Sequence, residues 1–196
     1  MKYTKKTDLT KGKIKQAFLD LLLEKKLEQI TVSSISTKAE INRSSFYRYY
    51  EDKYVLMDDI IDGFIEDIKA DNIRQEVNDS LDRFNHERAK EFFHYLQTYS
   101  KELNALFSDN AGRLFENRIR EVLTNHFFSS EVVKFERNPK NMVIKSFLID
   151  TIIYSLRYLG NVKSEEELDN LAEVMSDVYF KAFVPVANID VERVEK

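Results

Sequence analysis

Five side chains suited to binding nucleic-acid phosphates and bases lie close together between residues 43 and 48. They are Arg43, Ser44, Ser45, Tyr47 and Arg48. An arginine guanidinium can donate two hydrogen bonds to a guanine edge, while serine and tyrosine hydroxyls suit phosphate oxygens. Phe46 and Tyr50 are four residues apart and share another face of a helix over this segment. The spacing therefore predicts a short helix that is polar and basic on its outer side and aromatic on its inner side.

The residues around this segment predict a helix-turn-helix. A short helix before it would bury Val32, Ile35 and Ala39, and Ile41 would fill a tight turn. Caps are expected at Thr31 for the first helix, Asn42 for the second, which should reach about Tyr50, and Asp52 for the longer helix that follows. A bent helix pair can also be no more than core packing, so the fold pattern alone does not decide between the two interpretations.

The charge distribution favours a DNA-binding N-terminal part. Residues 1–53 hold 12 Lys and Arg against 7 Asp and Glu, a net charge of +5. Residues 54–196 hold 18 against 27, a net charge of -9. A basic segment on an acidic body is typical of a protein that meets a polyanion with one end, although chance clustering on a solvated surface gives the same numbers.

At this point the sequence resembles the TetR family of transcriptional regulators. The resemblance rests on T-V-x-x-I followed by K-A-x-I-N-R-S-S-F-Y-R-Y-Y-x-D-K and covers about Leu9 to Ile61. It implies that the helix from Arg43 to Tyr50 enters the major groove and that Tyr47 and Lys53 contact phosphates. Tyr49 stands where a phosphate-facing side chain is common, and Glu40 stands where glycine is frequent.

Together the residues and the resemblance define an expected DNA-binding set. It comprises Thr31, Arg43, Ser44, Ser45, Tyr47, Arg48, Tyr49 and Lys53. The phrase INRSSFYRYYEDK is most similar to a subgroup from low-GC Gram-positive bacteria, some of whose members activate transcription. The resemblance implies a regulator, expected to be a ligand-responsive repressor that binds a pseudo-palindromic operator as a homodimer. The alternative is an activator, or a regulator of the same fold that responds to a protein partner.

The rest of the chain predicts an all-α protein of about eight or nine helices. Only 4 Gly and 2 Pro occur, which favours long helices over hairpins and tight turns. Residues 1–8 are polar and are expected to form a mobile arm. Pro139 should begin a helix that Gly160 ends, and Ser164 with Glu167 should form a capping box for a last helix. We expect domains at 1–53 and 54–196, with the helices over 140–159 and 165–183 forming the dimer interface.

The aromatic residues of the second domain suggest a cavity for a small hydrophobic or aromatic effector. Rings converging from several helices are hard to pack without a gap, and TetR-like proteins commonly hold an effector among these helices. The expected ligand-binding residues are Phe92, His94, Tyr99, Phe115, Phe147, Tyr154 and Arg157. Asp150 and Arg157 are charges on a mostly apolar helix, and they could pair with each other, with the dimer mate or with a ligand.

Several other classes of protein are disfavoured. The chain has no cysteine, which excludes disulfides and thiolate metal sites. Glu91 and His94 form a single E-x-x-H, whereas di-iron bundles need two, so no metal and no cofactor are expected. His86 and His126 are isolated. No nucleophile elbow, phosphate loop or dinucleotide motif occurs, so an enzyme, including a helical-bundle enzyme, is a poor interpretation. No signal peptide or membrane span is apparent, and a cytoplasmic location is expected.

Overall fold

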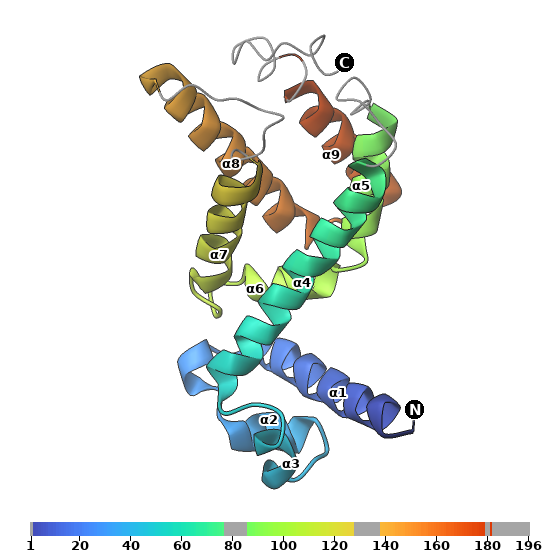
Figure 1. Cartoon of the computed structure of the whole chain (residues 1–196), viewed down its shortest axis with the longest axis vertical. Coiled ribbons are helices and arrows are strands. Elements are labelled where there is room, and N and C mark those ends of the chain that lie inside the picture. The colour runs from blue at the N-terminus through green and yellow to red at the C-terminus, as the bar shows by residue number, and fades with distance from the viewer. Residues whose placement is uncertain (1, 77–85, 128–137, 179–180, 182–196) are drawn as a thin grey trace. The chain divides into compact units, whose positions relative to one another are not determined.

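The computed structural model describes residues 2–76, 86–127, 138–178 and 181. These residues form nine α-helices and no strand, so the predicted all-α class is confirmed (Figure 1). The helices are α1 (Lys2–Glu24), α2 (Val32–Lys38), α3 (Arg43–Tyr47), α4 (Lys53–Glu76), α5 (His86–Gln97), α6 (Ser100–Leu106), α7 (Leu114–Val122), α8 (Pro139–Leu159) and α9 (Glu165–Asp177). A 3-10 turn, η1 (Leu27–Gln29), follows α1, and a π-helical turn, η3 (Leu123–Phe127), follows α7. None of the described helices is both long and apolar enough to cross a bilayer.

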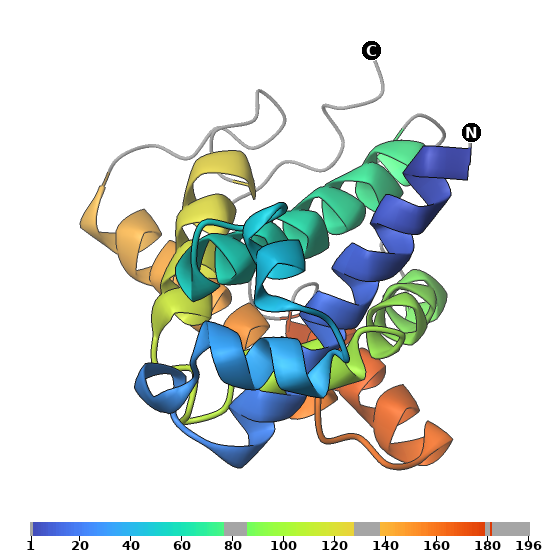
Figure 2. The same cartoon turned by 90° about the horizontal axis from the view of Figure 1, so that it is seen from below.

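The chain divides into two compact units. Unit 1 comprises residues 1–70 and 105–115, and unit 2 comprises residues 71–104 and 116–196. In unit 1, α1 packs on α2 and α2 packs on α3, around buried side chains that include Phe18, Ile35 and Phe46. Figure 2 shows α2 and α3, in lighter blue, with the turn that joins them. In unit 2, α5 packs along α9, and α8 contacts both α5 and α9.

Residues 107–113 of unit 1 are tied to the end of α1. The Leu27 backbone N–H donates to the Asn110 carbonyl at 2.8 Å, and the Asn110 side-chain amide donates to the Leu22 carbonyl at 2.9 Å. The ring of Phe115 lies 4.7 Å from that of Phe107 and 5.6 Å from that of Phe64, both in edge-on geometry. These three buried rings form an aromatic cluster within unit 1.

Most predicted helix boundaries are confirmed. The Thr31 hydroxyl accepts from the Ser34 backbone N–H at 3.1 Å, and the Asp52 carboxylate accepts from the first turn of α4. Pro139 lies in the first turn of α8 and Gly160 caps its end. The Ser164 hydroxyl accepts from the Glu167 N–H, although the Glu167 carboxylate accepts from Lys163 rather than closing a box with Ser164.

Other details of the prediction were wrong. Residues 2–8 belong to α1 rather than to a separate arm, and no Gly or Pro interrupts this segment before Gly12. Asn42 stands at the start of α3, but its side chain makes no capping hydrogen bond. The α-helix from Arg43 ends at Tyr47, and a turn carries the chain on to Tyr50. Beyond 178, residues 179–180 and 182–183 of the expected last helix lie outside the described residues.

Candidate nucleic-acid interface

The turn between α2 and α3 is fixed by backbone hydrogen bonds and by one strained residue. The Ile41 N–H donates to the Ser36 carbonyl at 3.0 Å, and the Glu40 N–H donates to the Thr37 carbonyl at 3.2 Å. Glu40 has φ +56°, in the left-handed region that favours glycine. Ala39, which ends α2, is buried. A larger side chain at this position would hold α2 and α3 apart. The departure from glycine noted in the sequence is therefore a real conformational cost.

The outer face of α3 presents cationic and hydroxyl side chains on an aromatic base. Phe46 is fully buried, and its ring contacts those of Tyr47 and Tyr50 at centroid distances of 5.7 and 5.8 Å. Because the base is packed, it holds the outer residues in place. Exposed residues are Thr31, Arg43, Ser44, Tyr47 and Arg48, and half-buried residues are Ser45 and Tyr49. The structure thus brings most of the expected DNA-binding set onto one short segment.

Lys53 links the start of α4 to residues 27–30 of unit 1 by hydrogen bonds. Its Nζ donates to the carbonyls of Leu27 at 2.7 Å, Glu28 at 3.2 Å and Ile30 at 2.8 Å. These carbonyls belong to η1 and its flanks, so the ammonium joins the start of α4 to the turn after α1. A lysine ammonium has three N–H donors. Each of them has a carbonyl partner here, and a phosphate contact would have to replace at least one of these bonds.

A second cluster fixes the end of the α3 segment to α1 and α4. The Tyr50 hydroxyl donates to Asp59 Oδ2 at 2.7 Å, and Lys15 Nζ lies 3.0 Å from the same oxygen. Lys11 Nζ is 3.8 Å from it and 5.4 Å from the Tyr50 ring centroid. Sequence inspection missed this cluster, because Tyr50 was assigned only an apolar role and Asp59 was not considered.

The electrostatics of this cluster favour an ionised Asp59 and a neutral Tyr50. Burial alone raises the pKa of Asp59, but hydrogen bonds from Tyr50 and Lys15 and the charges of Lys15 and Lys11 outweigh it. The pKa of Asp59 therefore lies below its ordinary value of 3.8. Burial, followed by the hydrogen bond to Asp59 and its negative charge, raises the pKa of Tyr50 well above its ordinary value.

Of the seven expected ligand-binding residues, Phe115 lies in unit 1 and the other six lie in unit 2, where three are exposed. Phe92 on α5 and Tyr99 in the turn after it are half-buried, with Phe92 against Phe93 and the Tyr99 hydroxyl 3.3 Å from that of Tyr95. His94 faces two carboxylates of α9. Phe115 is buried within unit 1. Phe147 and Tyr154 are 63% and 69% exposed. A groove of about 690 Å³ along α1 and the end of α2 is lined by none of the seven.

Asp150 and Arg157 pair with α7 rather than with each other. Arg120 Nη2 lies 2.6 Å from Asp150 Oδ1, and Arg157 Nη2 lies 2.8 Å from Glu116 Oε2. Arg120 also lies 3.6 Å from Glu116, so the four charges alternate in one chain along the two helices. The expectation that Asp150 and Arg157 could pair with each other was wrong, since each pairs with a residue of opposite charge on α7.

Comparison with known proteins agrees with this architecture. No family model matches the chain. A stretch of 55 residues, 28% of the chain, is 38% identical to an uncharacterized HTH-type transcriptional regulator, YxbF, of Bacillus subtilis (strain 168). That match covers 14% of the length of the Bacillus protein.

Two solved structures extend over nearly the whole chain. The crystal structure of a TetR transcriptional regulator from Streptococcus agalactiae 2603V superimposes with a TM-score of 0.57 and 23% identity, covering 90% of this chain and 98% of that one. The dihydroxyacetone kinase operon activator DhaS gives a TM-score of 0.50 and 20% identity, covering 89% and 97%. The chain therefore has the fold of the TetR transcriptional regulators, and the TetR-like fold expected from the sequence is confirmed.

Proposed function

We propose that the protein is a TetR-type transcriptional regulator that binds double-stranded DNA sequence-specifically through α3, and that it is not an enzyme. The observation that carries this proposal is an exposed set of side chains on α3 and at its C-cap, while Phe46 anchors the inner face of α3. The set consists of Arg43, Ser44, Tyr47 and Arg48. A short helix with a fixed base and exposed cations suits insertion into a major groove. The likeness to an HTH-type regulator over 55 residues supports the same function.

The roles within this surface follow from chemistry and exposure. Arg43 opens α3, where a recognition helix places its base-reading residues, and we assign it to a guanine edge. Tyr47 and Arg48 are exposed beside it and are assigned to phosphates, with Ser44, Ser45, Tyr49 and Thr31 completing the contact surface. Lys53 acts by holding η1 to the start of α4 in the free protein, and so it positions the surface.

The second domain, residues 54–196, is proposed to form a homodimer through α8 and α9. An apolar row on α8 is exposed and consists of Val143, Phe147, Tyr154 and Tyr158. Their spacing of four, seven and four residues keeps them on one helix face. Val174 is likewise exposed on α9. An exposed apolar face of this kind marks an interface, and a two-fold dimer would read a pseudo-palindromic operator with residues 1–53 of each copy.

The regulatory signal is proposed to be a small hydrophobic or aromatic molecule bound by the second domain. The half-buried rings of Phe92 on α5 and Tyr99 just after it support this proposal, whereas the exposure of Phe147 and Tyr154 suits the dimer better. Binding lowers operator affinity only if it favours one arrangement of the dimer over another. The alternative is a protein partner, or activation rather than repression, and the exposed apolar row of α8 is the feature that favours a protein.

Selection of binding sites from random DNA with the purified full-length protein tests the proposal. We expect an enriched sequence with inverted symmetry. Arg43→Ala should lose about 1–3 kcal/mol of discrimination at one base pair of each half-site. Arg113→Ala removes an exposed arginine of the same unit outside α2 and α3, and it should leave the preference unchanged. Selection that enriches no sequence, or equal behaviour of the two variants, would contradict the assignment.

A further inference from the structure

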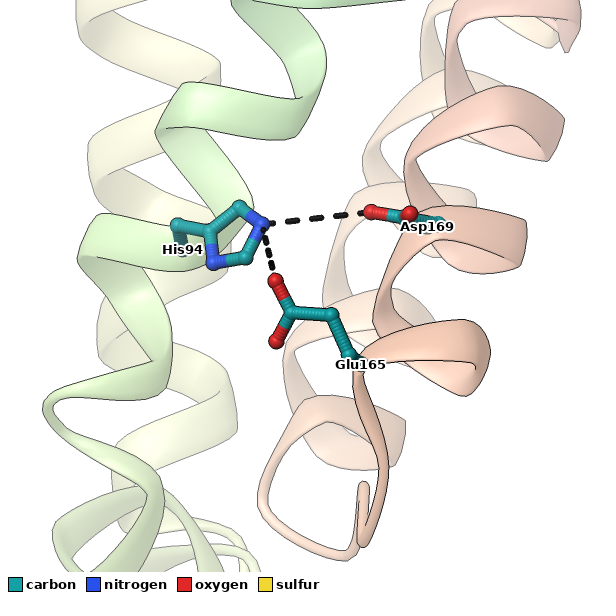
Figure 3. A group of neighbouring side chains, drawn as sticks. All are labelled: His94, Glu165 and Asp169. Carbon is teal, nitrogen blue, oxygen red and sulfur yellow. Dashed lines mark ion pairs between the residues drawn. The ribbon is translucent and has the colours of Figure 1, made fainter.

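Three potential metal ligands from two helices meet in unit 2. His94 lies on α5, and Glu165 and Asp169 lie four residues apart on one face of α9. His94 Nε2 is 3.2 Å from Glu165 Oε1 and 3.9 Å from Asp169 Oδ1 (Figure 3). One ligand atom from each residue falls within 4.8 Å of the other two. The arrangement therefore directs one imidazole nitrogen and two carboxylate oxygens to a common point.

The helices fix this arrangement. α5 packs along α9, with Phe93 and Leu96 buried on α5 and Leu168 and Ala172 buried on α9. The residues that meet are neighbours of this buried seam, so their backbones are held at a set distance. Ser164 caps the first turn of α9 and thereby fixes where Glu165 begins the helix. Such a supported set of side chains needs little reorganisation to bind an ion.

One carboxylate oxygen of Asp169 has a hydrogen-bond partner and the other has none among the described residues. Lys90 Nζ lies 2.8 Å from Oδ2. The Asp169 side chain is 38% exposed, but its Oδ1 atom is buried, and the residues that the structure describes supply that atom with no hydrogen-bond partner. Buried polar atoms are normally paired, and an orphan of this kind calls for an explanation such as an ion. Since Oδ1 is the oxygen on the side of His94, the unpaired lone pairs face the point where the three groups meet.

We propose that His94, Glu165 and Asp169 bind one divalent transition-metal ion, of which Zn²⁺ is the reference case. Bonds of about 2.0–2.2 Å in a tetrahedral site place neighbouring ligand atoms roughly 3.3–3.5 Å apart. The two distances from His94, 3.2 and 3.9 Å, lie near that spacing, and all three ligand atoms lie within 4.8 Å of one another, so side-chain rotations complete the site. The imidazole selects against Mg²⁺ and Ca²⁺, which prefer oxygen ligands, and water supplies the fourth position.

This site differs from the E-x-x-H pattern in the sequence. Glu91 is exposed one turn before His94 on α5, and it is not among the three residues that converge. The partners of His94 come from α9 instead, which the spacing along α5 could not indicate. A bound ion would join α5 to α9 within unit 2. The proposal concerns the free protein and does not depend on DNA binding.

Calorimetric titration of EDTA-treated full-length protein with ZnCl₂ tests the site. We expect one ion per chain, and His94→Gln and Glu165→Gln should each weaken binding at least about 10- to 100-fold, the loss typical of residues that only support a ligand. The matched controls are Glu166→Gln, which removes the neighbouring exposed carboxylate of α9, and Glu91→Gln. Both should bind as the unaltered protein does. Glu165 is 68% exposed at its side chain, so its substitution leaves the helix packing intact.

A second measurement separates an ion site from a simple ion pair between the helices. Substituting His94 removes such a pair with or without metal, whereas only an ion site makes the melting temperature rise on addition of Zn²⁺. We expect a rise in the unaltered protein and in both controls, and none in the His94 and Glu165 variants. The proposal is overturned by the absence of stoichiometric binding, by equal effects of Glu165→Gln and Glu166→Gln, or by loss with Glu91→Gln alone.

Discussion

Both α3 and α8 expose tyrosines, and the surroundings of these tyrosines point to different partners. On α3, Tyr47 is 51% exposed and its neighbours on the outer face are Arg43, Ser44 and Arg48. On α8, Tyr154 is 69% exposed and shares its face with Phe147 and Tyr158. A tyrosine among cations and hydroxyls suits a polyanion, whereas a tyrosine in an apolar row suits another apolar surface.

The charges of α8 strengthen this contrast. Asp150 and Arg157 lie on the same helix as the apolar row, and each is neutralised by a partner on α7. The row itself therefore carries no unpaired charge from either residue. By contrast, the structure gives no ion pair within the described residues to Arg43 on α3 or to Arg48 directly after it. The cations of α3 stay available to a ligand, while those beside the α8 row are used internally.

Introducing a charge into the α8 row should have the largest effect. Phe147→Asp should weaken self-association by about 2–4 kcal/mol, or roughly 30- to 1,000-fold, because the carboxylate would be desolvated at an apolar interface. Sedimentation over a concentration series measures this. Ser146→Asp adds the same charge at the neighbouring exposed position, off the row, and should change association much less. A variant Phe147→Asp protein that associates as tightly as the Ser146→Asp protein would show that α8 does not form the interface.

Alanine substitutions of one glycine in each unit should change the free energy of unfolding in opposite directions. A Cβ at Gly160 would lie 2.8 Å from the Asn104 backbone nitrogen, so Gly160→Ala should lower the free energy of unfolding by about 1–3 kcal/mol. Gly12 lies within α1 with open space around it, and Gly12→Ala should raise stability by up to about 1 kcal/mol. Denaturant unfolding measures both. Equal effects would mean that the approach of α8 to residues 103–104 is not tight in solution.

Substitution of Lys53 should lower the stability of the protein, whereas substitution of Arg48 should lower the salt dependence of DNA binding. Lys53→Met keeps the aliphatic stem but leaves three carbonyls without the ammonium, and we expect a loss of about 1–2 kcal/mol of stability with the salt dependence of DNA binding unaltered. Arg48→Ala should leave stability nearly unchanged and reduce the slope of log affinity against log salt by about 0.9. If Lys53→Met instead reduces the slope of log affinity against log salt and leaves the melting temperature unaltered, Lys53 contacts a phosphate, as the family resemblance implies.

The sequence predicted the contacts that are local in the chain. Thr31 and Asp52 accept hydrogen bonds from residues two or three positions later, at the starts of α2 and α4. Phe46 is buried, as the spacing of apolar residues in its own helix predicts. The contacts that define the candidate sites join distant residues. Lys53 binds a carbonyl 26 residues earlier, and Lys90 reaches Asp169 across 79 residues. Periodicity gives the face on which a side chain lies, but not which helix packs against that face.

The charges on α8 illustrate the same limit. Their spacing, two turns apart, made mutual pairing of Asp150 and Arg157 a reasonable expectation. Position along one helix says nothing of Arg120 and Glu116 on α7, which are the actual partners. The DNA-facing surface was more predictable, because a helix-turn-helix is a local motif whose inner and outer faces follow from one short stretch of sequence.

The Tyr50–Asp59 contact offers a pH-dependent test of how the DNA-facing segment is anchored. Tyr50→Phe should cost about 1 kcal/mol at neutral pH, since it removes one hydrogen bond to a partly exposed carboxylate. The folded-state pKa of Asp59 lies below 3.8, so its contribution is present above that value and is lost as the pH falls through the lower folded-state pKa. The stability difference between the two proteins should therefore shrink below about pH 4, as urea unfolding at several pH values would measure.

The smallest expected effect concerns the turn before α3, and it refines the view of α3 as a rigidly presented surface. Glu40 has φ +56°, where a residue with a Cβ pays about 1–2 kcal/mol that glycine does not. Glycine loses more chain entropy on folding, so Glu40→Gly should stabilise unit 1 by only about 0.5–1 kcal/mol. Gly112 has φ +71° in the same unit, and Gly112→Ala should have the opposite sign. Thermal unfolding of both variants measures the pair. If Glu40→Gly is instead destabilising, the turn is not strained, and the presentation of α3 depends on the packing of Phe46 and Ala39 alone.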